Sequence, residues 1–371
     1  MSELSLNQKQ WLALWLVPGI GPKRIGALLE HLGTVDQILG SSHAQLTGAG
    51  LRSDAAAGVM DAFEAERFHV ELDRISAKGV QLITRDDPEY STLLLEISDP
   101  PPLLYYKGSH QFDQSMHLAF VGSRKASNVG KSMTAALIKR IAEVAPETVI
   151  VSGLALGIDG AAHQAAIDNG LKTLAVLGNG LGSVYPAQHH QLATEVATHG
   201  AVISEFPMGT GPQAQNFPLR NRIVSGLCLG TMVIEAAERS GASITANLAL
   251  EQGREVFALP GPPNSAFCRG TNRMIQQGRA KLVLEVEDIF NELLPRFVPG
   301  PQKEPEPSVP LDLTAEEKQV MSLLELGPLH QDQLCQKLQL PIGQLLGVLT
   351  CLQMKELLIG RTGGIFEITP H

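Results

Sequence analysis

The sequence predicts an α/β protein: a doubly wound sheet with a helical domain before it and a winged helix after it. Residues 8–68 carry a helical pattern of apolar positions, whereas from residue 79 short apolar or β-branched runs alternate with stretches of helix length. A segment rich in proline and charge, residues 297–310, then precedes three more helical patterns and a hairpin. We therefore expect domains at residues 1–75, 76–296 and 313–371, with a linker at 297–312.

The first domain is expected to contain a helix-hairpin-helix. Residues 17–29 read VPGIGPKRIGALL, in which a PGIG turn separates two helices and Pro22 opens the second one. The backbone N–H groups of such a turn can bind a backbone phosphate without recognising base sequence. A weaker copy, LTGAGLR, follows at residues 46–52, so the domain resembles paired, sterile-alpha-motif-like helices. The alternative is a scaffold or interaction module that uses Gly19 and Gly21 only as turn residues.

The central domain is expected to contain a mostly parallel sheet. Its strands are expected at residues 80–84, 103–106, 118–121, 148–151, 173–177, 201–204, 232–235 and 255–259. Parallel strands need crossover connections, and the segments of suitable length are residues 131–145, 159–169, 188–199 and 243–252. The segments at residues 120–131 and 216–272, rich in Gly, Asn and Arg, are expected to contain loops at the ends of strands, with residues 122–127 and 217–222 on a common rim.

The last domain is expected to be a winged helix. Thr314 and Glu317 form a capping box at the start of its first helix. Two further helices and a hairpin follow at residues 331–338, 341–355 and 357–368. The recognition helix, 341–355, offers Lys355 as its only base, whereas groove recognition normally needs several polar or basic side chains on one helix face. A protein contact or a structural role is therefore favoured over DNA recognition.

The composition favours a globular protein of the cytoplasm. Of its 371 residues, 44% are hydrophobic and 5% aromatic, which allows several domains with sizeable cores. No run of about 18 apolar residues occurs, and residues 1–10 lack the basic and then apolar order of a signal peptide, so no membrane partner is expected. None of the four cysteines belongs to a CxxC pair, and reduced structural thiols are expected.

The net charge of −9 hides a local excess of bases. Residues 216–281 contain eight arginine and lysine residues against four acidic ones, and the excess coincides with glycine-rich segments that follow strands. Backbone N–H groups and arginines in such segments can hold phosphates. The sequence therefore predicts a phosphate-bearing partner, and the alternative is that these arginines lie on solvated helix faces.

No segment predicts catalysis, a cofactor or a metal site. GKS at 130–132 imitates the end of a Walker A loop but lacks its spacing, and no Ser-His-Asp or Cys-His signature occurs. GNGLG at 178–182 is not followed by the acid that a dinucleotide site needs. Asp159 and His163 stand four residues apart without a third metal ligand, so Asp159 is expected to anchor a loop or cap a helix, and His163 to be packed and hydrogen-bonded.

Seven motifs follow one another between residues 79 and 284. They are GSRKAS at 122–127, SGLALGIDGAAH at 152–163, GNGLGSVYP at 178–186, ISEFP at 203–207, FPLRNRIVSGL at 217–227, ERSGASITA at 238–246 and PGPPNSAFCRGTN at 260–272. Together they resemble the DNA processing protein A (DprA, or Smf) family. The resemblance implies a single-stranded DNA-binding protein of the cytoplasm, not an enzyme, that protects incoming DNA and helps to load the recombinase RecA during natural transformation. It also implies a homodimer and an extended Rossmann-like core.

The same motifs suggest a DNA site. Basic side chains are expected to pair with successive phosphates, serines and glycines to offer hydroxyls and close backbone approach, and Phe217 to stack on a base. The expected set is Gly122, Ser123, Arg124, Lys125, Ser127, Ser152, Gly153, Gly157, Phe217, Arg220, Asn221, Arg222, Gly270, Thr271 and Asn272. Six residues in this set or near it are expected mainly to fix loop geometry rather than to contact DNA: Glu205, Glu235, Asn221, Gly270, Thr271 and Asn272. The family typically carries lysine where this chain has Leu156, so one phosphate contact is expected to be missing.

Two other functions remain open. LGTMVIE at 229–235 faintly resembles the GTxxE element of the lonely-guy nucleotide phosphoribohydrolases, but Cys228 and Leu229 stand where their doubled glycine would be. Release of adenine from AMP would distinguish that enzyme. A pure protein-interaction scaffold would be favoured if no oligonucleotide bound at low salt.

Overall fold

The computed structural model describes residues 4–108, 115–238, 240–296, 314–324, 327, 329–355, 357–361 and 364–368. The chain forms two compact units, Met1–Pro301 and Gln302–His371, called the core unit and the C-terminal unit below. The linker expected at residues 297–312 lies outside the described residues.

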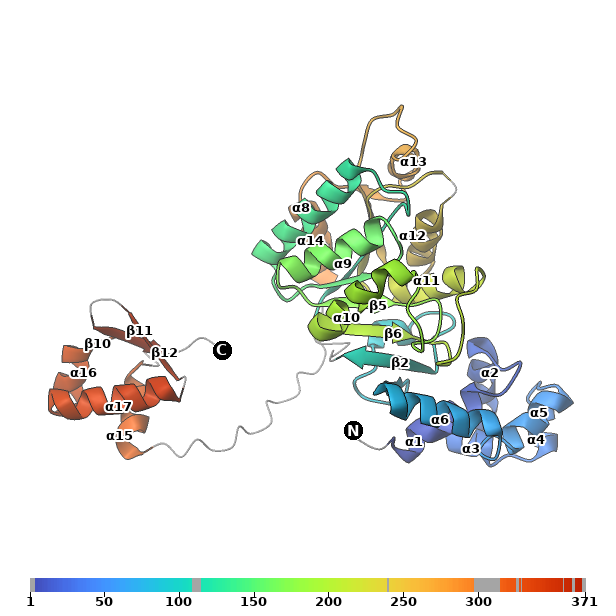
Figure 1. The fold of residues 1–371 in the computed structure, drawn as a ribbon, viewed down its shortest axis with the longest axis horizontal. Coiled ribbons are helices and arrows are strands. Elements are labelled where there is room, and N and C mark those ends of the chain that lie inside the picture. The colour runs from blue at the N-terminus through green and yellow to red at the C-terminus, as the bar shows by residue number, and fades with distance from the viewer. Residues whose placement is uncertain are drawn as a thin grey trace. The chain divides into compact units, whose positions relative to one another are not determined.

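A nine-stranded sheet runs through the core unit in the order β1-β2-β6-β5-β4-β3-β7-β8-β9. Figure 1 shows β2, β6 and β5 side by side in this order. From β6 to β9 in this order, neighbouring strands are parallel. These strands are β3 (His117–Val121), β4 (Val149–Ser152), β5 (Thr173–Val176), β6 (Gly200–Ser204), β7 (Gly230–Val233), β8 (Glu255–Ala258) and β9 (Lys281–Leu282). The other two, β1 (Gln81–Thr84) and β2 (Leu103–Gly108), extend the β6 edge in antiparallel orientation, which was not predicted.

Helices cover both faces of the sheet. Successive side chains of a strand point to opposite faces, so each strand contributes apolar side chains to the clusters on both sides. Leu118 and Phe120 of β3 pack in one cluster with α8 (Asn128–Val144), α9 (Ile158–Asp168) and α14 (Glu287–Leu293), and α10 (His190–His199) packs farther along this face. Ala119 and Val121 belong to the opposite cluster, with α7 (Thr92–Leu95), α11 (Asn216–Gly226), α12 (Gly241–Glu251) and α13 (Arg269–Gln276). The predicted doubly wound architecture is confirmed.

The direction of winding reverses beside β3. The strands β4, β5 and β6 extend the sheet on one side of β3, and the chain then returns to place β7 on its other side. In open α/β sheets, ligands bind outside the carboxyl ends of the strands at such a switch point. The chain after β3 leads to α8 and the chain after β7 leads to α12, on opposite faces, so the topology leaves a crevice between them.

Six helices precede the sheet and pack on its antiparallel edge. They are α1 (Leu6–Trp15), α2 (Pro22–Leu32), α3 (Val35–Leu39), α4 (His43–Gly48), α5 (Ser53–Met60) and α6 (Glu66–Lys78). Pro22 opens α2 after the PGIG turn, in which Gly19 has a φ of +78° that favours glycine. The helices share one hydrophobic cluster with Leu82 and Tyr105 of the sheet. The six helices therefore belong to the core unit. The domain boundary expected between residues 75 and 76 falls inside α6.

Two segments that were expected to be loops are helices. The FPLRNR motif lies in α11, and α13 begins at the end of the PGPPNSAFCRGTN motif. Local propensity disfavours both helices, because glycine, asparagine and proline are poor helix formers. However, Pro218 lies in the first turn of α11, where a missing N–H costs little, and Ile223 and Val224 are buried against the sheet. Tertiary packing therefore overrides the local preference.

The C-terminal unit is a winged helix. Three helices, α15 (Ala315–Leu324), α16 (Gln331–Leu338) and α17 (Ile342–Met354), surround an apolar cluster, and β10 (Leu329–His330), β12 (Ile365–Ile368) and β11 (Leu358–Arg361) form a sheet in that order. Thr314 and Glu317 form the predicted capping box. Glu317 also accepts a hydrogen bond from the Lys355 ammonium at 2.8 Å. The base at the end of the recognition helix therefore lies against a carboxylate.

Throughout the described ranges, no helix combines the length and the apolar character needed to cross a membrane. The four cysteines are free thiols, and Cys228 is buried.

Candidate functional site

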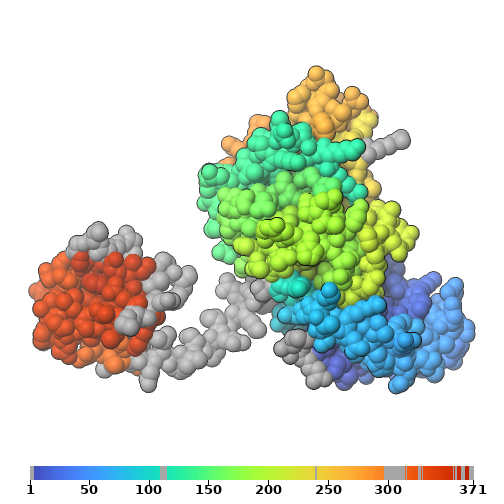
Figure 2. All heavy atoms as spheres, in the orientation of Figure 1, coloured from blue at the N-terminus to red at the C-terminus, as the bar shows by residue number. Residues whose placement is uncertain are grey.

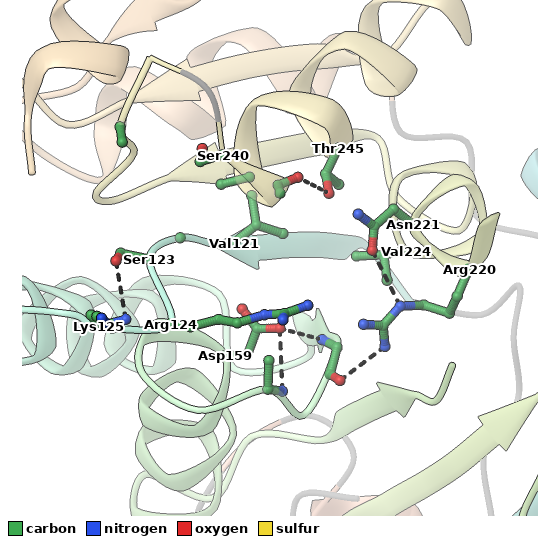
Figure 3. Close-up of a pocket in the computed structure, with 16 residues that line it drawn as sticks. Val121, Ser123, Arg124, Lys125, Asp159, Arg220, Asn221, Val224, Ser240 and Thr245 are labelled. Carbon is green, nitrogen blue, oxygen red and sulfur yellow. Dashed lines mark hydrogen bonds between the residues drawn. The ribbon is translucent and has the colours of Figure 1, made fainter. Parts of the chain in front are cut away.

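A pocket of about 400 Å³ opens at the switch point. Its walls come from four segments that are distant in the chain: the loop after β3, the loop after β4, α11 and the start of α12 (Figure 3). The polar and charged residues that line it are Ser123, Arg124, Lys125, Asp159, Arg220, Asn221, Ser240 and Thr245. The sheet topology thus brings the GSRKAS, SGLALGID and FPLRNR motifs to one site.

Two guanidinium groups approach the middle of this pocket from opposite sides, Arg124 from the β3 loop and Arg220 from α11 (Figure 3). Arg220 is buried, and its Nη1 donates to the Gly153 carbonyl at 2.9 Å. Burial, together with the like charge of Arg124, lowers the pKa of Arg220 to about 10, so this side chain remains a cation at pH 7. Arg124 and Lys125 are exposed, and neither forms an ion pair with any carboxylate of the described residues.

Asp159 is the single acidic residue in the lining. Its Oδ2 accepts the backbone N–H groups of Gly153 at 3.2 Å and Ala155 at 3.4 Å. Burial raises the pKa of Asp159, and the Arg220 charge opposes that shift. The predicted loop anchor is confirmed, and the three basic side chains of the lining outnumber the one carboxylate.

Three predicted glycines allow the walls of the pocket to approach each other. A Cβ atom at Gly157, which has a φ of +86°, would collide with the Ser123 carbonyl oxygen. A Cβ at Gly153 would collide with the Arg220 guanidinium, and one at Gly122 would press on the Ile158 side chain. These glycines therefore set the width of the pocket.

Two predicted serines hold the loops rather than line the pocket. Ser127 is the N-cap of α8, and its hydroxyl donates to the Glu235 carboxylate at 2.5 Å, beside a second bond from the Ser127 N–H at 2.9 Å. Ser152 is buried, and its hydroxyl donates to the Phe120 carbonyl at 2.6 Å. Glu235 and the hydroxyls of the two serines therefore hold the loops in place through these bonds.

Arg222 lies outside the pocket, which corrects the expectation for that residue. Residues two positions apart in a helix point to opposite sides, so Arg222 faces away from Arg220. Only 6% of Arg222 is exposed, and its guanidinium pairs with Glu205 at 2.6 Å and with Asp99 at 3.1 Å. A buried, ion-paired guanidinium is not available to a phosphate.

An aromatic pair lies beside Arg124. The Arg124 guanidinium carbon is 5.5 Å from the centroid of the Phe217 ring, a cation–π distance. The Tyr185 ring lies 5.4 Å from the Phe217 ring at an angle of 43°, and 46% of Tyr185 is exposed. Sequence reasoning missed Tyr185, although an aromatic residue in a polar, glycine-rich loop after a strand is a signal that could have found it.

The last predicted residues, Gly270, Thr271 and Asn272, face the interior of the core unit. Gly270 and Thr271 are buried at the start of α13, and the Asn272 amide bonds to the N–H and the carbonyl of Gly261 at 3.1 and 2.8 Å. None of the three lines the switch-point pocket. They fix loop geometry, whereas the flanking Arg269 and Arg273 are exposed.

His163 is a packed interior side chain. Its Nδ1 lies 2.7 Å from the Thr173 hydroxyl, and burial lowers the pKa of His163 to about 3, so it is neutral at pH 7. Among the described residues, no group of three or more histidine, cysteine or acidic side chains is placed to hold a metal ion.

A family model described as DNA recombination-mediator protein A matches residues 81–294. This range is more than half of the chain and includes the whole sheet and all four walls of the pocket. The chain belongs to this family. A second model, described as the DprA winged helix domain, matches residues 304–364, in agreement with the fold of the C-terminal unit.

Two relatives resemble the chain over more than half of its length. DNA processing protein DprA of Bacillus subtilis (strain 168) is 41% identical over 240 residues, which are 63% of this chain and 80% of that protein. Protein Smf of Escherichia coli (strain K12) is 46% identical over 213 residues, which are 57% of this chain and 56% of that protein.

Two solved structures of relatives share the fold. The structure of DNA processing protein A from Streptococcus pneumoniae matches with a TM-score of 0.68 and 35% identity, over 80% of this chain and 99% of that one. The protein of the same name from Helicobacter pylori, whose structure was described for its single-stranded DNA binding mode, matches with a TM-score of 0.52 and 28% identity, over 59% and 98% of the two chains.

Proposed function

We propose that the chain binds single-stranded DNA at the switch-point pocket and acts in DNA recombination without catalysing a reaction. The observation that carries this proposal is the convergence of Arg124, Lys125 and Arg220 on one pocket, with the Phe217 ring against Arg124. Cationic side chains along a groove hold successive phosphates, and a partly exposed ring such as that of Phe217 can stack on an unpaired base.

Three features favour a single strand over a duplex. The positive groups line a pocket of about 400 Å³, into which a single strand can enter but a duplex cannot. The aromatic pair offers a stacking surface that only unpaired bases can use. In the C-terminal unit, Lys355 is held by Glu317 rather than presented to a groove. The single-stranded DNA binding described for the Helicobacter pylori relative supports the same assignment.

We extend the proposal to a cytoplasmic homodimer that delivers single-stranded DNA to RecA during natural transformation. The support is the family description, a recombination mediator, and the relatives known as DNA processing proteins. A mediator must hold DNA without reading its sequence, and contacts to phosphates meet that need. Light scattering of the purified chain tests the dimer, and RecA filament formation on protein-coated single strands tests delivery.

Single-stranded DNA is expected to bind more tightly than duplex of equal length and with little preference for base sequence. Fluorescence anisotropy with labelled single- and double-stranded oligonucleotides, titrated over a series of salt concentrations, measures both affinities and their salt slopes. Binding to duplex that equals or exceeds binding to the single strand would remove the basis for this function. Absence of binding at low salt would favour the protein-interaction scaffold.

Removal of residues 309–371 is expected to leave most of the affinity for single-stranded DNA. The reason is that the switch-point pocket lies entirely in the core unit, and the Lys355 charge of the recognition helix is paired with Glu317. The truncated protein and the full chain are compared in the same anisotropy titration, with circular dichroism as the control for folding. Loss of most of the affinity in a folded truncated protein would assign the DNA contact to the winged helix.

A further inference from the structure

A second pocket, of about 350 Å³, lies between α12 and α13. Its lining contains two arginines, Arg273 and Arg279, together with the hydroxyl and amide side chains of Ser243, Asn247 and Gln277. Figure 2 shows the α13 segment, in orange, projecting from the surface of the core unit. The function proposed above makes no use of this pocket.

The two arginines give the second pocket an excess of positive charge. Both are exposed, and within the part of the chain that the structure describes neither forms an ion pair with a carboxylate. Arg279 donates to the neutral oxygens of Gln277 and Asn247. Glu238 is the only acid in the lining, so the lining has a net charge of +1, two arginines minus one glutamate. Guanidinium groups framed by neutral hydrogen-bonding side chains favour a phosphate oxyanion.

The second pocket adjoins the first. Ala237 lines the switch-point pocket and the next residue, Glu238, lines the second one; in α12 the same holds for Ala242 and Ser243. The start of α13 is attached to this segment by a hydrogen bond from the Gly270 N–H to the Ala236 carbonyl at 2.8 Å. A helix is about 10–12 Å wide with its side chains, so a strand that crosses the start of α12 can pass from the first pocket to the second within a few nucleotides.

We propose that Arg273 and Arg279 bind the sugar-phosphate backbone of the DNA strand that occupies the switch-point pocket, after the strand has crossed the start of α12. This second site presupposes the single-stranded DNA binding proposed above and lengthens its footprint. Its contacts are to phosphates, so it adds affinity and salt dependence without a preference for particular bases.

Oligonucleotide length separates the two sites in an experiment. The double variant Arg273→Ala/Arg279→Ala is titrated with a thymidine oligonucleotide of about four nucleotides, which fills one pocket, and with one of about twelve, which can span both. On the longer strand, the slope of log affinity against log salt should flatten by about 1.4, which is about 0.7 for each lost contact. On the shorter strand, affinity and slope should match those of the wild type. Both arginines are exposed, so the variant should fold normally.

Two further variants complete the test. Arg273→Lys/Arg279→Lys keeps both charges and should retain the wild-type slope on the longer strand. Lys172→Ala removes an exposed charge just before β5, at the end of the strands opposite to the switch-point pocket. It should leave the affinity and the salt slope unchanged. A wild-type slope for the double alanine variant on the longer strand, while Arg124→Ala flattens it, would overturn the second site and leave the proposed function intact. Wild-type affinity and salt slope for both the Arg273→Ala/Arg279→Ala variant and the Arg124→Ala variant would overturn the proposed function itself.

Discussion

Replacement of Arg222 by alanine is expected to lower the free energy of unfolding of the core unit by about 3–5 kcal/mol. The Arg222 guanidinium and the Glu205 carboxylate are 2.6 Å apart, with side chains that are 8% and 4% exposed. Alanine would leave the Glu205 carboxylate buried without its counter-charge, and burial already raises the pKa of Glu205 despite the arginine. Chemical denaturation at pH 7, followed by circular dichroism, measures the loss.

The double variant Arg222→Met/Glu205→Leu is the matched control. It removes both buried charges and keeps apolar volume, so it should recover most of the stability that Arg222→Ala loses. The sequence alone predicts a different result: a normally stable Arg222→Ala protein whose salt slope for DNA is flatter by one phosphate contact. That result would contradict the scaffold role that the structure gives to Arg222.

The arginines of α11 show how far the sequence could predict this site. Sequence reasoning identified the FPLRNR segment but expected a loop, and in a loop both arginines can reach a phosphate. In a helix, positions i and i+2 point to opposite sides, so Arg220 enters the pocket while Arg222 enters a buried ion pair. The difference follows from the secondary structure of α11, which tertiary packing determines and local propensity does not.

Contacts between loops that are far apart in the sequence could not be predicted either. A doubly wound sheet of mostly parallel strands could be predicted, because crossover helices are visible in the pattern of apolar residues. Tyr185 meets Phe217 only because the loop after β5 and the start of α11 end on the same rim of the sheet, and nothing near Tyr185 in the sequence specifies that neighbour. The direction of β1 and β2 was equally hidden, since the pattern within a short strand does not report whether its partner runs parallel or antiparallel.

Arg124→Ala and Phe217→Ala are expected to weaken single-stranded DNA binding through a shared contact. Loss of the Phe217 stacking surface should cost about 1–3 kcal/mol, and loss of Arg124 should flatten the salt slope by about 0.7. The sequence alone predicts that Phe217→Ala leaves the slope nearly unchanged. In the structure the Arg124 guanidinium lies 5.5 Å from the Phe217 ring, so removal of the ring also frees the cation, and the slope should flatten by part of the Arg124 effect.

A double-mutant cycle over a salt series measures this coupling. The loss of affinity in Arg124→Ala/Phe217→Ala should be smaller than the sum of the single losses by about 0.5–1 kcal/mol, the range for an exposed cation–π pair. Lys172→Ala, which removes an exposed charge away from the pocket, is the control and should be additive with Phe217→Ala. Strictly additive losses and an unchanged slope for Phe217→Ala would mean that ring and cation act on DNA separately. A Phe217→Ala protein with wild-type affinity would instead make the ring a packing residue, because a base stacked on it could not be lost without cost.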